Sequence, residues 1–408
     1  MKVSEDKTNK LTHTPILKNR LFSWIKLLVL GMALEAILRE NLYSFGINII
    51  EKIQYNINEN YLMISLLRVL SFMATKDCLI ILIFLTFNYF DMYTTLIVVE
   101  VCGCCSIGTG LFKLIYKNPR PFFHEEWVKV YDCETGYGNP SGHSIVVVST
   151  YLTFWKIFKL KYHINPKLRK YLFALLCTFI FSVLFSRLAL GVHSLNQIFL
   201  GSFIGYQIYS LIFYVLNINL DLELEIKSLI NYHYLNIMAA VMTSLLLFGF
   251  VVFNFFPLSM NLDVDKYLQR ILETCPGTPY SKVFDYEAYF MLSSCSILLG
   301  AYYGIYYDIK VNLKSSDEWV QINTGKFLWN KTSVFKSFIR ILVMASVLIV
   351  PFSLTVFISS HAHTNIIFIL KNLVPYFVIS FCLFAFVRKA CDSFHCTNKL
   401  VKETKSAN

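Results

Sequence analysis

Long apolar runs separated by short polar loops are the main pattern of the chain. Nine such runs are each near the roughly 20 residues that a helix needs to cross the hydrocarbon core of a bilayer. They cover residues 63–90, 92–113, 142–160, 171–190, 195–217, 236–257, 286–307, 337–358 and 366–388. The pattern predicts an all-α fold, namely a polytopic membrane helix bundle with about nine transmembrane helices.

One further apolar run, residues 21–38, precedes the nine and carries Lys26 and Glu35. It could cross the membrane or lie on its surface, and the basic residues before it favour crossing with a cytoplasmic N-terminus. We therefore expect residues 1–60 to contain a basic tail and this first segment. Residues 61–390 should form the membrane-embedded domain, and residues 391–408 a cytoplasmic tail.

Composition agrees with the membrane interpretation. Of 408 residues, 56% are hydrophobic and 16% aromatic, which is too apolar for a soluble protein of this size. The net charge of +11 could suggest nucleic acid, but the basic residues lie in short loops and tails. Retention of Lys and Arg in the cytoplasm explains that distribution, so no nucleic-acid partner is expected. The cysteines show no metal-ligand spacing.

The loop charges also predict an orientation. The connection after residues 142–160 holds Lys159, Lys161, Lys167, Arg169 and Lys170 with no acidic residue, so it should be cytoplasmic. Alternation along the chain then places residues 114–141, 191–194, 258–285 and 359–365 on the lumenal or exterior side. Residues 309–336 and the tail after residue 388 stay in the cytoplasm.

Three short blocks hold cationic side chains at the ends of apolar runs. They are KLIYKNPRP (113–121), NPSGHS (139–144) and SRLALGVHSLNQ (186–197). Charged groups at such places are costly unless they serve a function. On the predicted topology all three blocks lie on one side of the membrane, so we expect their side chains to meet in one pocket.

The cations of these blocks suit a phosphate dianion. Arg120 and Arg187 can each offer two parallel hydrogen bonds, whereas Lys113 offers a point charge. Ser141 and Gly142 add a hydroxyl and close-approaching backbone N–H groups at a helix start.

Two histidines complete the predicted pocket. His143 and His193 on opposite sides of a phosphate would supply a general acid and a nucleophile. A single His, Lys or Arg at a helix end is more often an interfacial side chain that reaches the head groups. Five of them within three short motifs on one side favour a functional site.

The spacing inside the blocks resembles the signature of the type 2 phosphatidic acid phosphatase superfamily. It reads Lys with six residues before Arg-Pro, then Pro-Ser-Gly-His, then Ser-Arg with five residues before His. The resemblance implies a phosphoric monoester hydrolase with no metal or other cofactor. It also implies the residue roles: phosphate binding by Lys113, Arg120, Ser141, Gly142 and Arg187, nucleophilic attack by His193, and protonation of the leaving group by His143.

Gln197 departs from many members of that superfamily, which have Asp four residues after the nucleophilic His. An amide can accept a ring N–H and hold the tautomer, although it supports positive charge less well. The sequence is similar to the glucose-6-phosphatase family, which also has Gln here and a second motif like CETGYGNPSGHS (133–144). That resemblance implies nine membrane helices and an active site in the endoplasmic reticulum lumen. A weakened or inactive enzyme is the other explanation of Gln197.

The leaving group is less defined, because the catalytic residues contact only the phosphate. Glucose 6-phosphate or a related sugar phosphate is the main interpretation. Polar candidates for the sugar hydroxyls are Tyr131, Asp132, Glu134, Asn139 and residues 263–286. A lipid or isoprenoid phosphate, such as phosphatidic acid, a sphingoid-base phosphate or dolichyl pyrophosphate, is the alternative. Whether a transporter partner delivers a soluble substrate to the lumen is left open.

Two further alternatives concern function and a cross-link. An anion transporter could use the same basic pocket without cleavage, but it would not need two opposed histidines. Cys133 and Cys275 both fall on loops predicted to face an oxidising compartment. They could form a disulfide or remain unpaired.

Overall fold

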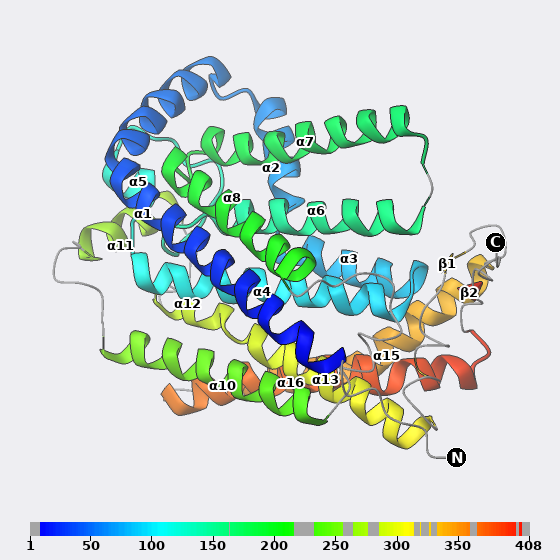
Figure 1. The fold of residues 1–408 in the computed structure, drawn as a ribbon. Coiled ribbons are helices and arrows are strands. Elements are labelled where there is room, and N and C mark those ends of the chain that lie inside the picture. Colours follow the sequence, from blue (N-terminus) through cyan, green and yellow to red (C-terminus); the bar gives the residue numbers. More distant parts are fainter. Residues whose placement is uncertain are drawn as a thin grey trace, which may run out of the picture.

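The chain is helical almost throughout the part that the structure describes (Figure 1). The computed structural model describes residues 9–162, 164–215, 232–255, 264–275, 285–313, 319, 326–327, 333–359, 365–396 and 400–401. One antiparallel strand pair, β1 (Lys326–Phe327) with β2 (Leu400–Val401), joins the loop before residue 333 to the predicted tail. The all-helical prediction is confirmed apart from this pair.

The first predicted segment lies within α1 (Asn9–Ile57), one helix of 49 residues. The next apolar run was expected to be continuous over 63–90, but it forms two helices, α2 (Tyr61–Phe72) and α3 (Lys76–Tyr89), bent by 53°. The break lies at a polar stretch, where the Thr75 hydroxyl accepts a hydrogen bond from the Cys78 N–H and starts the new helix. A second cap, Asn60, starts α2 in the same way.

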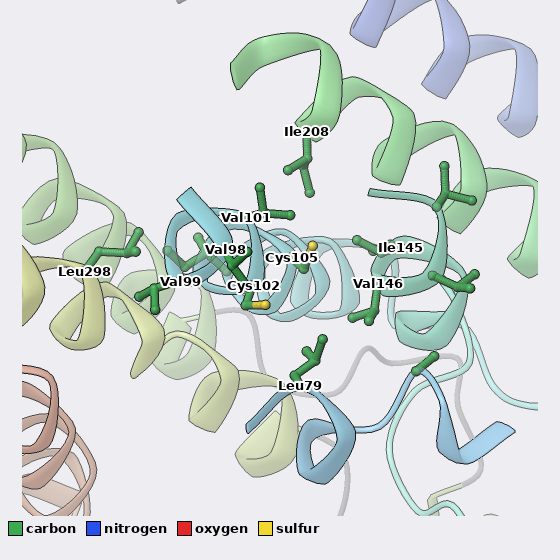
Figure 2. Packing of buried hydrophobic residues seen from close by; sticks show 14 of the residues in the cluster. Leu79, Val98, Val99, Val101, Cys102, Cys105, Ile145, Val146, Ile208 and Leu298 are labelled. Carbon is green, nitrogen blue, oxygen red and sulfur yellow. The ribbon is translucent and has the colours of Figure 1, made fainter. Parts of the chain in front are cut away.

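Helix α4 (Met92–Tyr116) runs through the middle of the molecule (Figure 1). Figure 2 shows side chains from other helices packed around it: Leu79 of α3, Ile145 of α6 (Gly142–Lys161), Ile208 of α8 (Leu195–Ser210) and Leu298 of α13 (Ser294–Tyr307). A helix that is apolar on every side is stable only when it is surrounded. This central position carries the end of α4 to the place where the motif blocks meet.

The other helices lie on either side of α4. On one side are α6, α7 (Pro166–Ala189), α8 and the π-helical turn η1 (Leu211–Val215) that continues α8, and α1 packs along α8. On the other side are α10 (Tyr232–Phe255), α12 (Asp285–Met291), α13, η3 (Asp308–Asn312), α15 (Val334–Ser359) and α16 (Asn365–Ser393). Two short helices, α5 (Pro121–His124) and α11 (Val264–Thr274), pack on each other near the ends of the bundle.

The number of membrane helices differs from the prediction. Among the described residues, six helices are long and apolar enough to cross a membrane, or seven if α2 and α3 form one bent span. The described part of the chain thus supports six or seven of the roughly nine predicted spans. Helix α6 carries Lys156, Lys159 and Lys161, and α8 ends after 16 residues. Residues 18–57 of α1 are one of the six candidate spans, so the first apolar run lies in a helix that is long and apolar enough to cross a membrane.

Candidate active site

The three motif blocks meet at one end of the bundle, as the sequence predicts. Lys113 lies in the last turn of α4, Arg120 precedes α5, and His143 is the second residue of α6. Arg187 lies in the last turn of α7, and His193 is in the turn before α8. Arg120, Arg187 and His193 are fully buried. Buried guanidinium groups require anionic partners, because desolvating an unpaired charge is expensive.

The anionic partner of both arginines is Glu134. Its Oε2 lies 2.7 Å from Nη2 of Arg120, and its Oε1 pairs with Nη2 of Arg187. The same carboxylate lies between the two histidines, with Oε1 3.5 Å from His143 Nδ1 and Oε2 3.7 Å from His193 Nε2. An anion held by two guanidinium groups and flanked by two imidazoles is the arrangement that phosphate transfer to histidine requires.

Each arginine also has partners other than Glu134. Arg120 donates to the carbonyl oxygens of Gly136, at 2.8 Å, and Val192, at 3.1 Å. Its Nη1 lies 3.0 Å from His193 Nε2. Arg187 contacts the Ser71 hydroxyl and an Asp132 carboxylate oxygen, the latter at 3.2 Å. The guanidinium groups are therefore held in place before any substrate enters, so little reorganisation is needed on binding.

Gln197 contacts the imidazole of His193 through its amide oxygen. His193 Nδ1 lies 3.1 Å from Gln197 Oε1, and Gln197 Nε2 donates to the carbonyl of Pro119 at 2.7 Å. Because the amide nitrogen is used by a carbonyl, the amide oxygen must face the ring, and it can only accept a proton from Nδ1. The lone pair of the imidazole is thereby left on Nε2, which points toward Glu134. The predicted ability of Gln197 to hold the tautomer is consistent with this geometry.

The second motif places its backbone tightly against α4 and α8. The Ser141 N–H donates to the Gln197 carbonyl at 3.1 Å, and the Ser141 hydroxyl caps α6 by accepting from Ser144. A Cβ added to Gly142 would lie 3.1 Å from the Thr109 methyl group. Only a glycine fits this close approach easily, and it leaves the start of α6 near the pocket.

Lys113 lies somewhat apart from the other cations. Its Nζ is 3.6 Å from Glu287 Oε1, in α12, and Glu287 also accepts from the Thr135 hydroxyl at 3.3 Å. The sequence gives no motif around Glu287, so its place beside the first block could not be foreseen. The C-terminal half therefore contributes a carboxylate to the same end of the bundle.

Glu35 of α1 is a second acidic residue whose role the sequence left undecided. It is fully buried, and its Oε1 accepts from Asn139 Nδ2 at 3.1 Å and from Asn196 Nδ2 at 3.3 Å. Arg39, one turn later, pairs with it at 2.8 Å. Glu35 thus joins α1 to both the second and the third motif block. A carboxylate inside an apolar run was the signal that could have found it.

The ionisation states suit a nucleophilic histidine. Burial raises the pKa of Glu134, but the charges of Arg120 and Arg187 lower it more, and the resulting pKa lies well below the ordinary 4.5. Burial lowers the pKa of His193 to about 3, and Arg120 acts in the same direction. At neutral pH Glu134 is therefore a carboxylate and His193 a neutral imidazole. A neutral Nε2 has the lone pair that attack on phosphorus requires.

A disulfide and the absence of a clustered metal site complete the description. Cys133 and Cys275 form a disulfide, so the open question of their pairing is answered in favour of the cross-link. It joins the residue before Glu134 to the end of α11. In the part of the chain with defined placement, no group of three or more His, Cys, Asp and Glu side chains is arranged to hold a metal ion.

The comparisons with known proteins identify the region around this pocket. Residues 90–221 match the model of the PAP2 superfamily. The match contains all three motif blocks and the helices α4 to α8 that carry them, so the predicted superfamily is confirmed for this part of the chain. No curated protein sequence matches the chain. None of these findings singles out the glucose-6-phosphatase family.

One solved structure is also similar to part of the chain. It is described as the first transmembrane PAP2 type phosphatidylglycerolphosphate phosphatase, from Bacillus subtilis. The two share 20% sequence identity with a TM-score of 0.41, and the similarity covers 49% of this chain and 97% of that chain.

Proposed function

We propose that the protein is a membrane-embedded phosphomonoesterase that works through a phosphohistidine on His193. The main support for this proposal is the position of the Glu134 carboxylate, which two buried arginines hold between His193 and His143. The PAP2 superfamily match over the same residues supports the reaction class. An anion transporter would use the arginines, but it would not need a nucleophile oriented by Gln197.

The proposed reaction has two steps. Burial and the charge of Arg187 lower the pKa of His143 well below its ordinary value, so His143 must take up a proton together with the phosphate dianion. In the first step, Nε2 of His193 attacks phosphorus, the bond from phosphorus to the leaving-group oxygen breaks, and His143 gives that oxygen its proton. Second, His143 takes a proton from water, the water oxygen attacks phosphorus, and the P–N bond to His193 breaks to release inorganic phosphate. Both histidines return to their starting states. Arg120 and Arg187 stabilise the charge on the non-reacting oxygens.

The remaining motif residues are assigned to phosphate binding. Ser141 and Gly142 open α6, where backbone N–H groups and the helix dipole favour an anion. Lys113, whose Nζ lies 3.6 Å from Glu287 Oε1, would add charge from α4. No metal is invoked, because the charge of the phosphate is met by side chains.

For the leaving group we propose a lipid or isoprenoid phosphate. The PAP2 superfamily match covers the motif blocks whose spacing resembles that of the type 2 phosphatidic acid phosphatases. The site also lies at the ends of long apolar helices, where the head group of a membrane lipid resides. A sugar phosphate is the second candidate, supported by the partly exposed carboxylates of Asp132 and Glu287, which could accept hydrogen bonds from hydroxyls.

A hydrolysis panel tests both candidates. The purified protein is given phosphatidic acid, sphingosine 1-phosphate, dolichyl pyrophosphate, glucose 6-phosphate and other sugar phosphates at matched detergent, and released phosphate is measured. We expect the highest kcat/KM for a lipid; a wide preference for glucose 6-phosphate would reverse the order of the two candidates. His193→Ala should abolish release from every substrate, and full release by that variant would refute the phosphohistidine.

We also propose that the site faces away from the cytoplasm. The support is the basic connection between α6 and α7, at the end of these helices opposite to His143 and Arg187. An endoplasmic reticulum location with a lumenal site follows only from the resemblance to glucose-6-phosphatase. A glycosylation sequon introduced between residues 125 and 130 should be modified in cells, whereas one introduced between residues 159 and 170 should not.

A further inference from the structure

We infer that the Glu134 carboxylate occupies the position that the substrate phosphate takes, and that phosphate must displace it to bind. The protein would then bind phosphate in competition with its own carboxylate. This inference rests on the proposed function, because it assumes that the two arginines are the phosphate ligands. It goes further in assigning Glu134 a role in setting affinity.

The contacts of Glu134 are those of a bound oxyanion. Its two oxygens bridge Arg120, at 2.7 Å from Nη2, and Arg187. A phosphate presents more oxygens of the same kind, so the same donors can hold it. Replacing a carboxylate by a phosphate dianion strengthens each charge-assisted contact, which favours exchange when phosphate is present.

Simultaneous occupancy by Glu134 and phosphate is excluded. The carboxylate lies between the general acid and the nucleophile, 3.5 Å from His143 and 3.7 Å from His193. Phosphorus must come within bonding distance of His193 while its ester oxygen meets His143, so it needs this space. Two anions in one buried pocket also repel each other. Productive binding therefore requires the carboxylate to leave.

The carboxylate serves a purpose in the empty site. Arg120 and Arg187 are fully buried, and two guanidinium groups without an anion would repel each other and lose hydration. Glu134 bridges both groups, with Asp132 as a second anion on Arg187, and keeps them in the geometry that phosphate needs. The consequence is a weaker apparent affinity, since only the fraction of molecules with the carboxylate displaced can bind.

The local structure allows the displacement. About a fifth of the Glu134 side chain, 20%, is exposed, so the side chain is not enclosed on every side. Residue 134 lies outside any helix, and the neighbouring Cys133 is anchored by its disulfide to Cys275. Because the backbone is held there, rotation of the Glu134 side chain is the simplest movement that frees the two guanidinium groups for phosphate.

Calorimetric titration of the full chain in detergent with inorganic phosphate tests the inference. Glu134→Gln, which keeps the shape but removes the charge, should bind phosphate about ten-fold or more tightly than the wild type, because the competing anion is gone. The matched control is Glu126→Gln, on the same loop with an exposed side chain, and its affinity should be unchanged. Equal or weaker phosphate binding by Glu134→Gln would overturn the inference.

A measurement on the wild type covers the case in which Glu134→Gln does not fold. Carboxylates are labelled with a water-soluble carbodiimide and an amine, with and without orthovanadate, and the modified peptides are quantified by mass spectrometry. Labelling of Glu134 should rise several-fold when vanadate fills the site, while labelling of Glu126 stays constant. Unchanged or reduced labelling of Glu134 would overturn the inference.

These results separate the two proposals. If the wild type hydrolyses phosphate esters and His193→Ala does not, the proposed function stands whatever the outcome for Glu134. If the wild type neither binds phosphate nor releases it from any ester, the proposed function fails, and the inference fails with it.

Discussion

His193 Nδ1 lies 3.1 Å from Gln197 Oε1, while the Gln197 amide nitrogen donates to the Pro119 carbonyl at 2.7 Å. The second hydrogen bond determines the first, because it turns the amide oxygen toward the imidazole. An uncharged residue can therefore give His193 the tautomer that leaves Nε2 ready to attack. In the proposed mechanism Gln197 would provide orientation without the negative charge that an aspartate would add.

Removing this orientation should slow the chemical step. We expect Gln197→Ala to lower kcat by about 10- to 100-fold, the usual cost of losing an outer hydrogen-bond partner, with little change in KM. Steady-state phosphate release measures both constants. Gln207→Ala, a buried glutamine of the same helix but remote from the motif blocks, should keep nearly full activity. Equal losses in the two variants would contradict the orienting role.

A side chain at Gly138 should also disturb the contact between Gln197 and His193. A Cβ at this position would lie 2.5 Å from Gln197 Nε2, so Gly138→Ala must push the amide away from Pro119 or from His193. We expect a fall in kcat similar to that of Gln197→Ala, and no further fall when the two are combined. Gly108→Ala on α4 is the control, since its nearest neighbour would be at 3.5 Å. Additive losses in the double variant would argue against a shared cause.

Glu35 should be important for stability as well as for activity. Glu35→Ala would leave Arg39 and the amides of Asn139 and Asn196 without their common acceptor. Breaking a buried ion pair costs about 3 to 5 kcal/mol, so we expect a clearly lower Tm in detergent and reduced phosphate release. Glu40→Gln, an exposed carboxylate of the same helix, should change neither. A wild-type Tm for Glu35→Ala would refute the link between α1 and the motif blocks.

The disulfide between Cys133 and Cys275 should stabilise the loop that carries Glu134. We expect Cys275→Ser to lower the free energy of unfolding by about 2 to 4 kcal/mol, and reducing agent to lower the Tm of the wild type but not of this variant. Cys177→Ser, at an exposed thiol of α7, is the control. Peptide mapping without reduction should recover the 133–275 pair; two unmodified thiols would contradict it.

The lowered pKa of His193 predicts how stability depends on pH. The unfolded chain protonates this residue near its ordinary 6.5, whereas the folded chain does so only near 3. Between these values the unfolded state binds more protons, so stability falls as pH falls, by up to about 1.4 kcal/mol per pH unit. His193→Asn should show a shallower loss of Tm from pH 6.5 to 5. An identical slope in both proteins would rule out this assignment.

Glu134 contributes to the same curve at lower pH. Its lowered pKa stabilises the fold above its ordinary 4.5 and loses effect as the pH falls toward the folded value. Comparing the Tm of the wild type and His193→Asn only above pH 5 therefore separates the contribution of His193 from that of Glu134.

Much of the candidate site could be predicted because its residues lie in short local motifs. The spacing of Lys113 and Arg120, or of Arg187 and His193, places each pair at one helix end before any tertiary contact is known. Glu287 and Glu35 could not be assigned in this way, since each is more than 100 residues from a motif residue that it contacts. Their contacts depend on how α12 and α1 pack on the catalytic helices.

The membrane-helix count shows a second limit. Hydropathy marks apolar runs of spanning length, but it does not show whether a run bends, as between Phe72 and Lys76. Nor does it separate helices that face lipid from helices such as α4 that are enclosed by others. Helix caps decide where a run bends, and packing partners decide whether a helix is enclosed. Hydropathy along the sequence reports neither.

The sequence by itself predicted the helical membrane class, the superfamily that residues 90–221 match, and the set of candidate site residues, because these depend on local hydropathy and on short spacings. Tertiary structure alone decided that Glu134 fills the anion position, that Glu35 joins α1 to two motif blocks, and that Cys133 pairs with Cys275. Each of these is a contact between segments whose separation in the sequence carries no signal. Only packing brings the segments within hydrogen-bonding or bonding distance.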